Sequence, residues 1–367
     1  MGVRSLVRCS LSVLFLTFLA YANDAVSVDS QRGAELFQSL PCVRCHNVNG
    51  KGNGRGPDLG KRLRSEYSPA GIAARMWNHA PTMWSALEDQ GLAVEPLGKQ
   101  AAADLFGYFY SIRFLDRPTD VARGRKLFES ERCSECHASD EEQASMSRLA
   151  GKPVSKWTSL VRPLEFAVAI WGHAAFEQSS TKRAKLKGQE LLDIFAYLRE
   201  LPQAPKSSPR MDTQISDGSN ALEANGCAGC HKAKYDLARR LRTKMVTDVA
   251  AAMWNHTKIP QTPVLKNAEM QQVIDYLWMQ QVLEPAGDID AGREVFESRC
   301  AQCHNGSGVA PSLVNRKGNV SVSSIVSALW THGPQMLKRL RQNNSEWPRF
   351  TQDQMADVIA FLNSGGR

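Results

Sequence analysis

The stretch Cys42-Val-Arg-Cys45-His46 places two cysteines three positions apart and a histidine directly after the second one. The same pattern recurs three times along the 367-residue chain. The further copies are Cys133-Ser-Glu-Cys136-His137, Cys227-Ala-Gly-Cys230-His231 and Cys300-Ala-Gln-Cys303-His304. The only cysteine outside these motifs is Cys9, near the N-terminus. The cysteines are therefore arranged as one repeated site.

The C-x-x-C-H pattern is the attachment signature of c-type haem. On one helical turn, two thiols three positions apart can each form a thioether with a porphyrin vinyl group, and the adjacent imidazole can bind the iron. Disulfides, thioredoxin-like pairs and zinc sites also use closely spaced cysteines, but they do not explain a histidine in every copy. The sequence thus predicts four covalently attached haem c groups. The predicted attachment residues are Cys42, Cys45, Cys133, Cys136, Cys227, Cys230, Cys300 and Cys303, and the predicted iron ligands are His46, His137, His231 and His304.

The N-terminus has the pattern of an export signal. Arg4 and Arg8 precede an apolar run, and Ala20-Tyr21-Ala22 supplies the small residues of a cleavage site, which predicts a signal peptide over residues 1–22. The run is shorter than the roughly 20 residues of a transmembrane helix, so a membrane anchor is the weaker alternative. The mature chain is expected to have no membrane span and to lie in the periplasm, with association with the outer membrane or release from the cell as alternatives.

Each motif is preceded by a short helical segment, such as "RGAELFQS" from Arg32, and followed by an apolar-periodic helix, such as "ADLFGYFYSI" from Ala103. Proline-containing stretches mark the boundaries between these repeats. The predicted regions after the signal peptide are unit 1 (23–117), unit 2 (118–202), a Pro/Ser-rich linker (203–217), unit 3 (218–285) and unit 4 (286–367).

Each unit resembles a class I cytochrome c domain. The resemblance is carried by the glycine-bearing first helix, the C-x-x-C-H motif, a loop such as "GRGPDLG" (Gly54 to Gly60) and a last helix ending in motifs such as "FAYL". It covers almost all of the chain after residue 22. It implies an all-α fold of four tandem small domains, each wrapped around one haem with its first and last helices crossing, and it implies electron transfer. Unit 3 departs most, because its first helix, "GSNALEAN", is degenerate.

The remaining four histidines each stand two positions after a tryptophan. These motifs are Trp77-Asn-His79, Trp171-Gly-His173, Trp254-Asn-His256 and Trp330-Thr-His332. The residues three and seven positions before each histidine are apolar, and such positions share one helix face. This predicts a helix, begun at Ser68-Pro69 in unit 1 and at Thr247 in unit 3, whose apolar stripe covers the haem. We therefore expect mostly bis-histidine ligation, with His79, His173, His256 and His332 as second ligands; histidines packed in the core are the alternative.

Methionine is the competing second ligand, as it is in class I cytochromes generally. Met83 follows His79 by four positions, and Met336 follows His332 by four. Both share the face of the preceding histidine if the helices continue past Pro81 and Pro334. Methionine ligation is thus an alternative for units 1 and 4 only.

Charge says little about binding partners. The chain has a formal net charge of +8, but part of it belongs to the signal peptide, and each haem adds two propionates that are ionised at neutral pH. The basic sequence is thus no indication of nucleic-acid binding, which export also disfavours. The expected partners are redox proteins: a membrane quinol-oxidising or dehydrogenase complex and a terminal acceptor.

If protein side chains fill both axial positions, no iron position is open to a substrate. The expected function is an electron-transfer relay in a respiratory or extracellular electron-transfer chain, and not an enzyme. One alternative is a multihaem oxidoreductase, a peroxidase or an oxyanion reductase or oxidase, with one open haem. We would expect that haem in unit 2, whose "WGHAAFE" has lost the proline and methionine of units 1 and 4. A structural subunit of a larger cytochrome complex is the other alternative.

Overall fold

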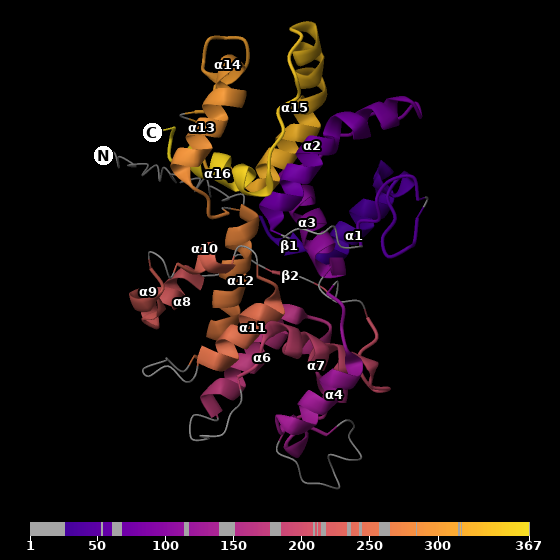
Figure 1. The fold of residues 1–367 in the computed structure, drawn as a ribbon, viewed down its shortest axis with the longest axis vertical. Helices are drawn as coiled ribbons and strands as arrows, with labels where there is room; N and C mark the ends of the chain where they lie inside the picture. The colour runs from indigo at the N-terminus through magenta and orange to yellow at the C-terminus, as the bar shows by residue number, and fades with distance from the viewer. Residues whose placement is uncertain are drawn as a thin grey trace, which may run out of the picture.

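The computed structural model describes residues 26–52, 54–60, 68–113, 117–138, 151–176, 185–207, 210, 212–213, 218–232, 236–241, 244–256, 265–283, 285–314, 316 and 318–366. The predicted signal peptide lies outside them. The helices are α1 (Ser30–Ser39), α2 (Pro69–Glu88), α3 (Lys99–Arg113), α4 (Val121–Ser130), α6 (Pro163–Phe176), α7 (Gly188–Glu200), α8 (Gly218–Ala224), α9 (Cys227–Cys230), α10 (Leu237–Leu241), α11 (Val246–His256), α12 (Asn267–Leu283), α13 (Ile289–Arg299), α14 (Ala301–His304), α15 (Val322–Gln342) and α16 (Gln352–Asn363). The all-α prediction is confirmed (Figure 1). None of the helices described here combines the length and apolar character needed to cross a bilayer.

In every unit the first helix crosses the last one at a glycine, so that α1 packs on α3, α4 on α7, α8 on α12 and α13 on α16. A Cβ added to any of these glycines would stand 2.0–2.2 Å from a backbone carbonyl oxygen of the last helix. Only glycine therefore permits so close an approach. The glycines and the residues whose oxygens they face are Gly33 and Asp104, Gly124 and Asp193, Gly218 and Gln272, and Gly292 and Asp357.

In three units a buried carboxylate of the last helix stabilises the crossing by accepting hydrogen bonds from the start of the first helix. In unit 1, Asp104 accepts hydrogen bonds from the backbone N–H of Asp29 (2.9 Å) and from the Arg32 guanidinium (2.6 Å). Units 2 and 4 repeat the backbone bond, from Asp120 to Asp193 (2.9 Å) and from Asp288 to Asp357 (2.8 Å). In unit 3 the corresponding residue is Gln272, which agrees with the degenerate sequence of its first helix.

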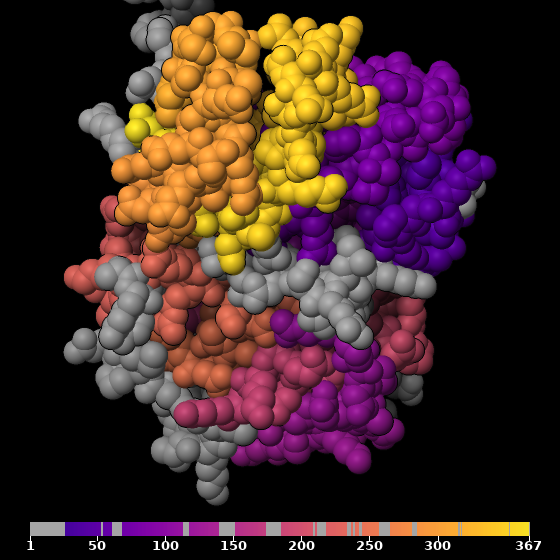
Figure 2. All heavy atoms as spheres, turned by 45° about the horizontal axis from the view of Figure 1, so that its top comes forward, coloured from indigo at the N-terminus to yellow at the C-terminus, as the bar shows by residue number. Residues whose placement is uncertain are grey.

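The four units pack as two pairs and not as a row. In unit 1, α2 lies against α15 and α16 of unit 4, whereas α6 of unit 2 lies against α11 and α12 of unit 3. Figure 1 shows α2 beside α15 in one half of the molecule and α6 beside α11 in the other. The space-filling view in Figure 2 shows the first and last parts of the chain together in one half, with the middle of the chain in the other. Units 2 and 3, which follow unit 1 in the sequence, therefore form one half of the molecule, and unit 4 packs back against unit 1.

The hydrophobic cores follow the same pairing. One large cluster of buried side chains comes mainly from units 2 and 3, and a second comes from units 1 and 4. The resemblance implied four small domains, each wrapped around one haem. A unit of about eighty residues buries too little surface to be secure by itself, and sharing a core with a neighbour enlarges the apolar area removed from water.

A two-stranded antiparallel sheet ties the linker to the start of unit 1. Strand β1 (Val28–Asp29) pairs with β2 (Asp212–Thr213), with Val28 opposite Thr213. Nearby, the Arg210 guanidinium donates a hydrogen bond to the side-chain oxygen of Gln31 at 3.1 Å. The part of the predicted linker at Asp212–Thr213 is therefore paired with the start of unit 1.

Candidate haem-binding sites

Each C-x-x-C-H motif forms one helical turn. In all four, the backbone N–H of the histidine donates to the carbonyl of the first cysteine at 2.9 Å. Positions i, i+3 and i+4 of a helix share a face, so both thiols and the imidazole stand on one side of the turn. No disulfide joins any of the eight motif cysteines in the described chain. This arrangement fits a planar group attached at two thiols beside an imidazole.

The first cysteine of the motif faces apolar surroundings in at least three units. Burial raises the pKa of the Cys42 and Cys300 thiols to about 11, and it also raises the pKa of Cys227. The first thiol of the motif therefore lies on the buried side of its turn in these units.

Within the described chain, a carbonyl further along the sequence orients the motif imidazoles of units 1, 2 and 4. The Nδ1–H of the ring donates to this carbonyl, which leaves Nε2 with a lone pair. Metal-binding histidines are commonly held in this way. The pairs are His46 with Pro57 (2.9 Å), His137 with Lys152 (3.0 Å) and His304 with Pro311 (2.8 Å).

Loop glycines make room for two of these rings, a role that sequence reasoning missed. A Cβ on Gly56 would stand 2.9 Å from the His46 ring, and one on Gly151 would stand 2.4 Å from the His137 ring. In unit 2 the indole of Trp157 also meets His137 edge-on, with ring centroids 4.7 Å apart. The only signal in the sequence was a glycine followed closely by proline after the motif.

The Trp-x-His helices bring a second imidazole opposite the first in three units. We call the pairs sites 1, 2 and 3, and the histidines of unit 4 site 4. The distances between ring centroids are 6.4 Å for His46 and His79, 5.4 Å for His137 and His173, and 5.8 Å for His231 and His256. In site 2 the two Nε2 atoms are 3.1 Å apart. Imidazole nitrogens on opposite sides of one metal ion lie about 4 Å apart, each about 2 Å from it, so the two Nε2 atoms of site 2 are close to a ligating spacing.

Site 2 shows how the second imidazole is held. The Nδ1–H of His173 donates to the carbonyl of Ala169, one turn earlier in α6, at 2.7 Å. Its Nε2 is thereby turned toward His137. Burial, together with the facing histidine, lowers the pKa of His79, His137 and His256. The neutral imidazole is the form that binds a metal.

Unit 4 differs from the others. His332 is exposed on α15, and although both residues lie in described parts of the chain, no ring contact joins it to His304. Helices α2 and α15 do continue through Pro81 and Pro334. Met83 packs against the cluster of Ala80, Trp84 and Leu329 between these helices. The second ligands of all four units remain predictions, with methionine as the alternative in units 1 and 4.

The open haem of the enzyme alternative, expected in unit 2, stays a prediction; His137 and His173 form the closest of the three ring pairs there. The structure corrects one helix start. Ser68 caps α2 as predicted, accepting a hydrogen bond from the backbone of Gly71 at 3.0 Å, but α11 begins at Val246, one residue before Thr247.

The middle residue of two Trp-x-His motifs joins the paired units, which sequence reasoning also missed. Asn78 donates to the carbonyl of Phe350 (2.7 Å) and accepts from its N–H (2.8 Å). Asn255 makes the same two bonds with Leu186, at 2.7 and 3.2 Å. Both partners directly precede the N-cap residue of the last helix of the neighbouring unit. The shared "WNH" of units 1 and 3 was the available signal.

Comparison with protein families agrees with this geometry. Residues 30–90 and 121–202 match the family described as Cytochrome c, and residues 287–362 match the family described as Cytochrome C oxidase, cbb3-type, subunit III. Neither a curated protein nor a solved structure matches the chain. The matched segments lie in units 1, 2 and 4 and include the motif cysteines of each. The chain therefore contains cytochrome c domains, which imply covalently bound haem c and haem-based electron transfer.

Proposed function

We propose that the protein is an exported tetrahaem c-type cytochrome of four cytochrome c-like domains, which relays electrons between redox partners. The observation that carries the proposal is the facing of two imidazoles beside the C-x-x-C-H turn in sites 1, 2 and 3, with ring centroids 5.4–6.4 Å apart. A histidine that only packed in the core would not be expected to face a second imidazole in three units. Four copies of the C-x-x-C-H turn support one haem per unit.

The chain's own residues have distinct roles in this proposal. The two thiols of each motif would hold the group covalently, and the motif histidine and the Trp-x-His histidine would hold the iron from opposite sides. When bound, a c-type haem supplies a one-electron iron couple. Imidazoles on both sides leave no iron position for a substrate, so electrons would pass to and from the protein without bond formation.

The proposed partners are a membrane quinol-oxidising or dehydrogenase complex and a terminal acceptor. Contacts between electron-transfer proteins are typically small and short-lived. The proposed location is the periplasm, after cleavage of the signal peptide at residues 1–22, or further out at the outer membrane or cell exterior.

One observation favours a second candidate, an oxidoreductase with an open haem in unit 4. His332 is exposed, and within the described chain no ring contact joins it to His304. A haem held there by His304 alone would have a free axial position. Peroxidase or oxyanion chemistry would then be located in unit 4 and not in unit 2.

Low-temperature EPR of the oxidised holoprotein, combined with a haem count per chain, tests the proposal. We expect four haems and only low-spin signals. A high-spin signal from one of the four irons, assigned to unit 4 by its insensitivity to His79→Ala, His173→Ala and His256→Ala, would favour the enzyme instead. The matched control is Asn255→Ala, beside His256, which should leave the spin states unchanged.

A further inference from the structure

Trp171 lies where the second-histidine helices of units 2 and 3 meet. Its ring centroid is 6.0 Å from that of His256, with 36° between the ring planes, and its side chain is buried. On its other side, His256 faces His231 at 5.8 Å. Two residues after Trp171 on the same helix, His173 faces His137. The Trp171 indole thus lies between the two sites. Its helix carries His173 of site 2, and its ring contacts His256 of site 3.

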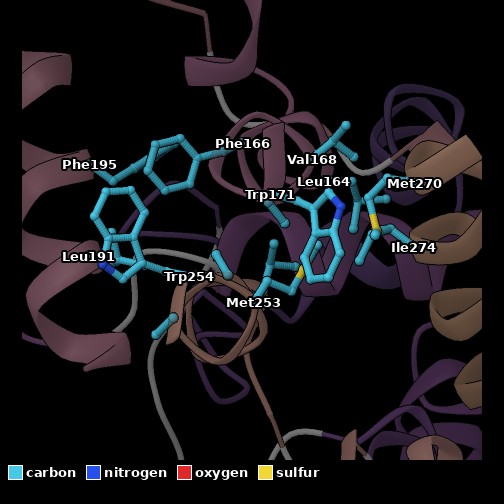
Figure 3. Packing of buried hydrophobic residues seen from close by; sticks show 14 of the residues in the cluster. Leu164, Phe166, Val168, Trp171, Leu191, Phe195, Met253, Trp254, Met270 and Ile274 are labelled. Carbon is cyan, nitrogen blue, oxygen red and sulfur yellow. The ribbon is translucent and has the colours of Figure 1, made fainter. Parts of the chain in front are cut away.

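The surroundings of this indole are apolar. Figure 3 shows it among Leu164, Met253, Met270 and Ile274, away from the indole of Trp254, which lies beside Leu191 and Phe195. The Trp171 Nε1–H is buried and has no hydrogen-bond partner among the described residues. Buried tryptophans usually find a partner. Charges on either side of such a region interact more strongly than they would in water.

The other pair of units lacks this contact. In units 1 and 4, Trp330 meets Trp84 edge-on at 6.5 Å, and its Nε1–H donates to Met76 Sδ at 3.4 Å. Within the described chain, the contact between a motif tryptophan and a second histidine of the neighbouring unit occurs only at Trp171. A direct contact between a motif tryptophan and a second histidine of the neighbouring unit therefore distinguishes the interface of units 2 and 3.

We infer that sites 2 and 3 form a redox pair across the contact of α6 with α11, with Trp171 as the positioning residue that spans the gap. This inference rests on the proposed function. With haem held by His137 and His173 in site 2 and by His231 and His256 in site 3, one electron would pass from the reduced iron of one site to the oxidised iron of the other. No bond forms or breaks, no proton moves, and Trp171 is itself neither oxidised nor reduced. Electrons would therefore exchange directly between sites 2 and 3.

This pairing is tested by the reduction potentials of the four sites, measured in a redox titration of the holoprotein that is monitored by EPR. The test needs no activity assay. His256→Met raises the potential of site 3, because methionine raises haem potentials relative to histidine. Site 3 is then already reduced when site 2 is titrated, and its extra electron disfavours the reduction of site 2. We expect that reduction constant to fall, because the extra electron of site 3 acts across an apolar contact, where charges interact more strongly than in water; a tenfold fall would be about 59 mV for a one-electron couple.

Reciprocity identifies the partner. Coupling between two sites acts equally in both directions, so His173→Met must raise the potential of site 2 and lower that of the site whose signal changes in His256→Met. The pairing is overturned if the shifted signal is instead the one altered by His79→Met or His332→Met, or if no second signal shifts. If His256→Met leaves all four signals unchanged, then His256 is not a ligand, and it is the proposed ligation that fails.

A second pair of variants tests Trp171 without removing a ligand. Trp171→Phe should change the EPR signal of site 3 and reduce the coupling between sites 2 and 3. The matched control is Trp278→Phe, which changes an equally buried tryptophan of the same core that packs on Tyr110 with ring centroids 4.0 Å apart. Equal effects of the two variants on site 3 would show that Trp171 acts only through packing, and would remove it from the proposal.

Discussion

The backbone of Gly33 lies so close to the carbonyl of Asp104 that a Cβ on Gly33 would stand 2.0 Å from its oxygen. Gly33→Ala must therefore separate α1 from α3. We expect a loss of about 1–3 kcal/mol or more in the free energy of unfolding, the usual cost of overpacking, measured by guanidinium denaturation followed by far-UV circular dichroism. The control is Gly98→Ala, outside the haem-attachment motifs, where an added Cβ meets nothing within 4 Å. If the two variants had equal denaturation midpoints, α1 would not approach α3 as closely at Gly33 as the structure shows.

The paired hydrogen bonds between Asn78 and Phe350 give a second prediction. Asn78→Ala leaves the backbone N–H and carbonyl of buried Phe350 without their partners, at a cost of about 1–3 kcal/mol. Thr331→Ala is the control, because Thr331 holds the same motif position in unit 4 but its hydroxyl bonds only to Ser327 of its own helix. It should change stability by less than about 0.5 kcal/mol. If both variants unfold at the same denaturant concentration, the two bonds do not fasten the units together.

The local part of the sites could be predicted from sequence because their atoms lie within one or two helical turns. Cys42, Cys45 and His46 share one turn, so their spacing alone fixes which face they occupy. The crossing of first and last helices followed in the same way from the family resemblance. The glycine loops around His46 and His137 were harder to predict, because their only signal in the sequence is a glycine followed closely by a proline.

The pairing of units could not be predicted, because it depends on contacts between residues far apart in the chain. The Trp77 Nε1–H donates to the carbonyl of Pro348 at 2.7 Å, across 271 positions. Apolar periodicity also cannot distinguish a face that covers a haem from one that packs on another helix. Leu329 belongs to the predicted haem-facing stripe, yet it lies in the cluster between α2 and α15.

Asp275 gives a prediction about pH. Burial raises its pKa to about 6, although the Gln271 amide and the nearby Arg162 oppose this shift and Glu165 adds to it. The ordinary aspartate pKa is about 3.9, so between about pH 4 and 6 the folded state binds more protons than the unfolded one. The stability contributed by this group is full below about pH 4 and is lost as the pH rises through about 6.

Asp275→Asn should therefore stabilise the holoprotein near pH 7, by up to about 2–3 kcal/mol, and should change little near pH 4. Denaturation midpoints at the two pH values measure this difference. Asp290→Asn is the control, because the Asp290 side chain is 88% exposed. A variant whose advantage is the same at both pH values would show that the Asp275 carboxylate is not the titrating group.

The closeness of His137 and His173 gives the last prediction. If His173 holds the iron of unit 2 opposite His137, His173→Ala vacates that position, and the reduced protein should gain one carbon-monoxide-binding haem per chain that the wild type lacks. Glu165→Gln is the matched control on the same helix, because Glu165 pairs with Arg162 and Thr158 away from the histidines. A carbon monoxide difference spectrum measures the gain, and an unchanged haem content shows that the variant has matured. If that spectrum is the same in His173→Ala and in the wild type, the second ligand of unit 2 is not His173, and the bis-histidine assignment of the closest pair is wrong.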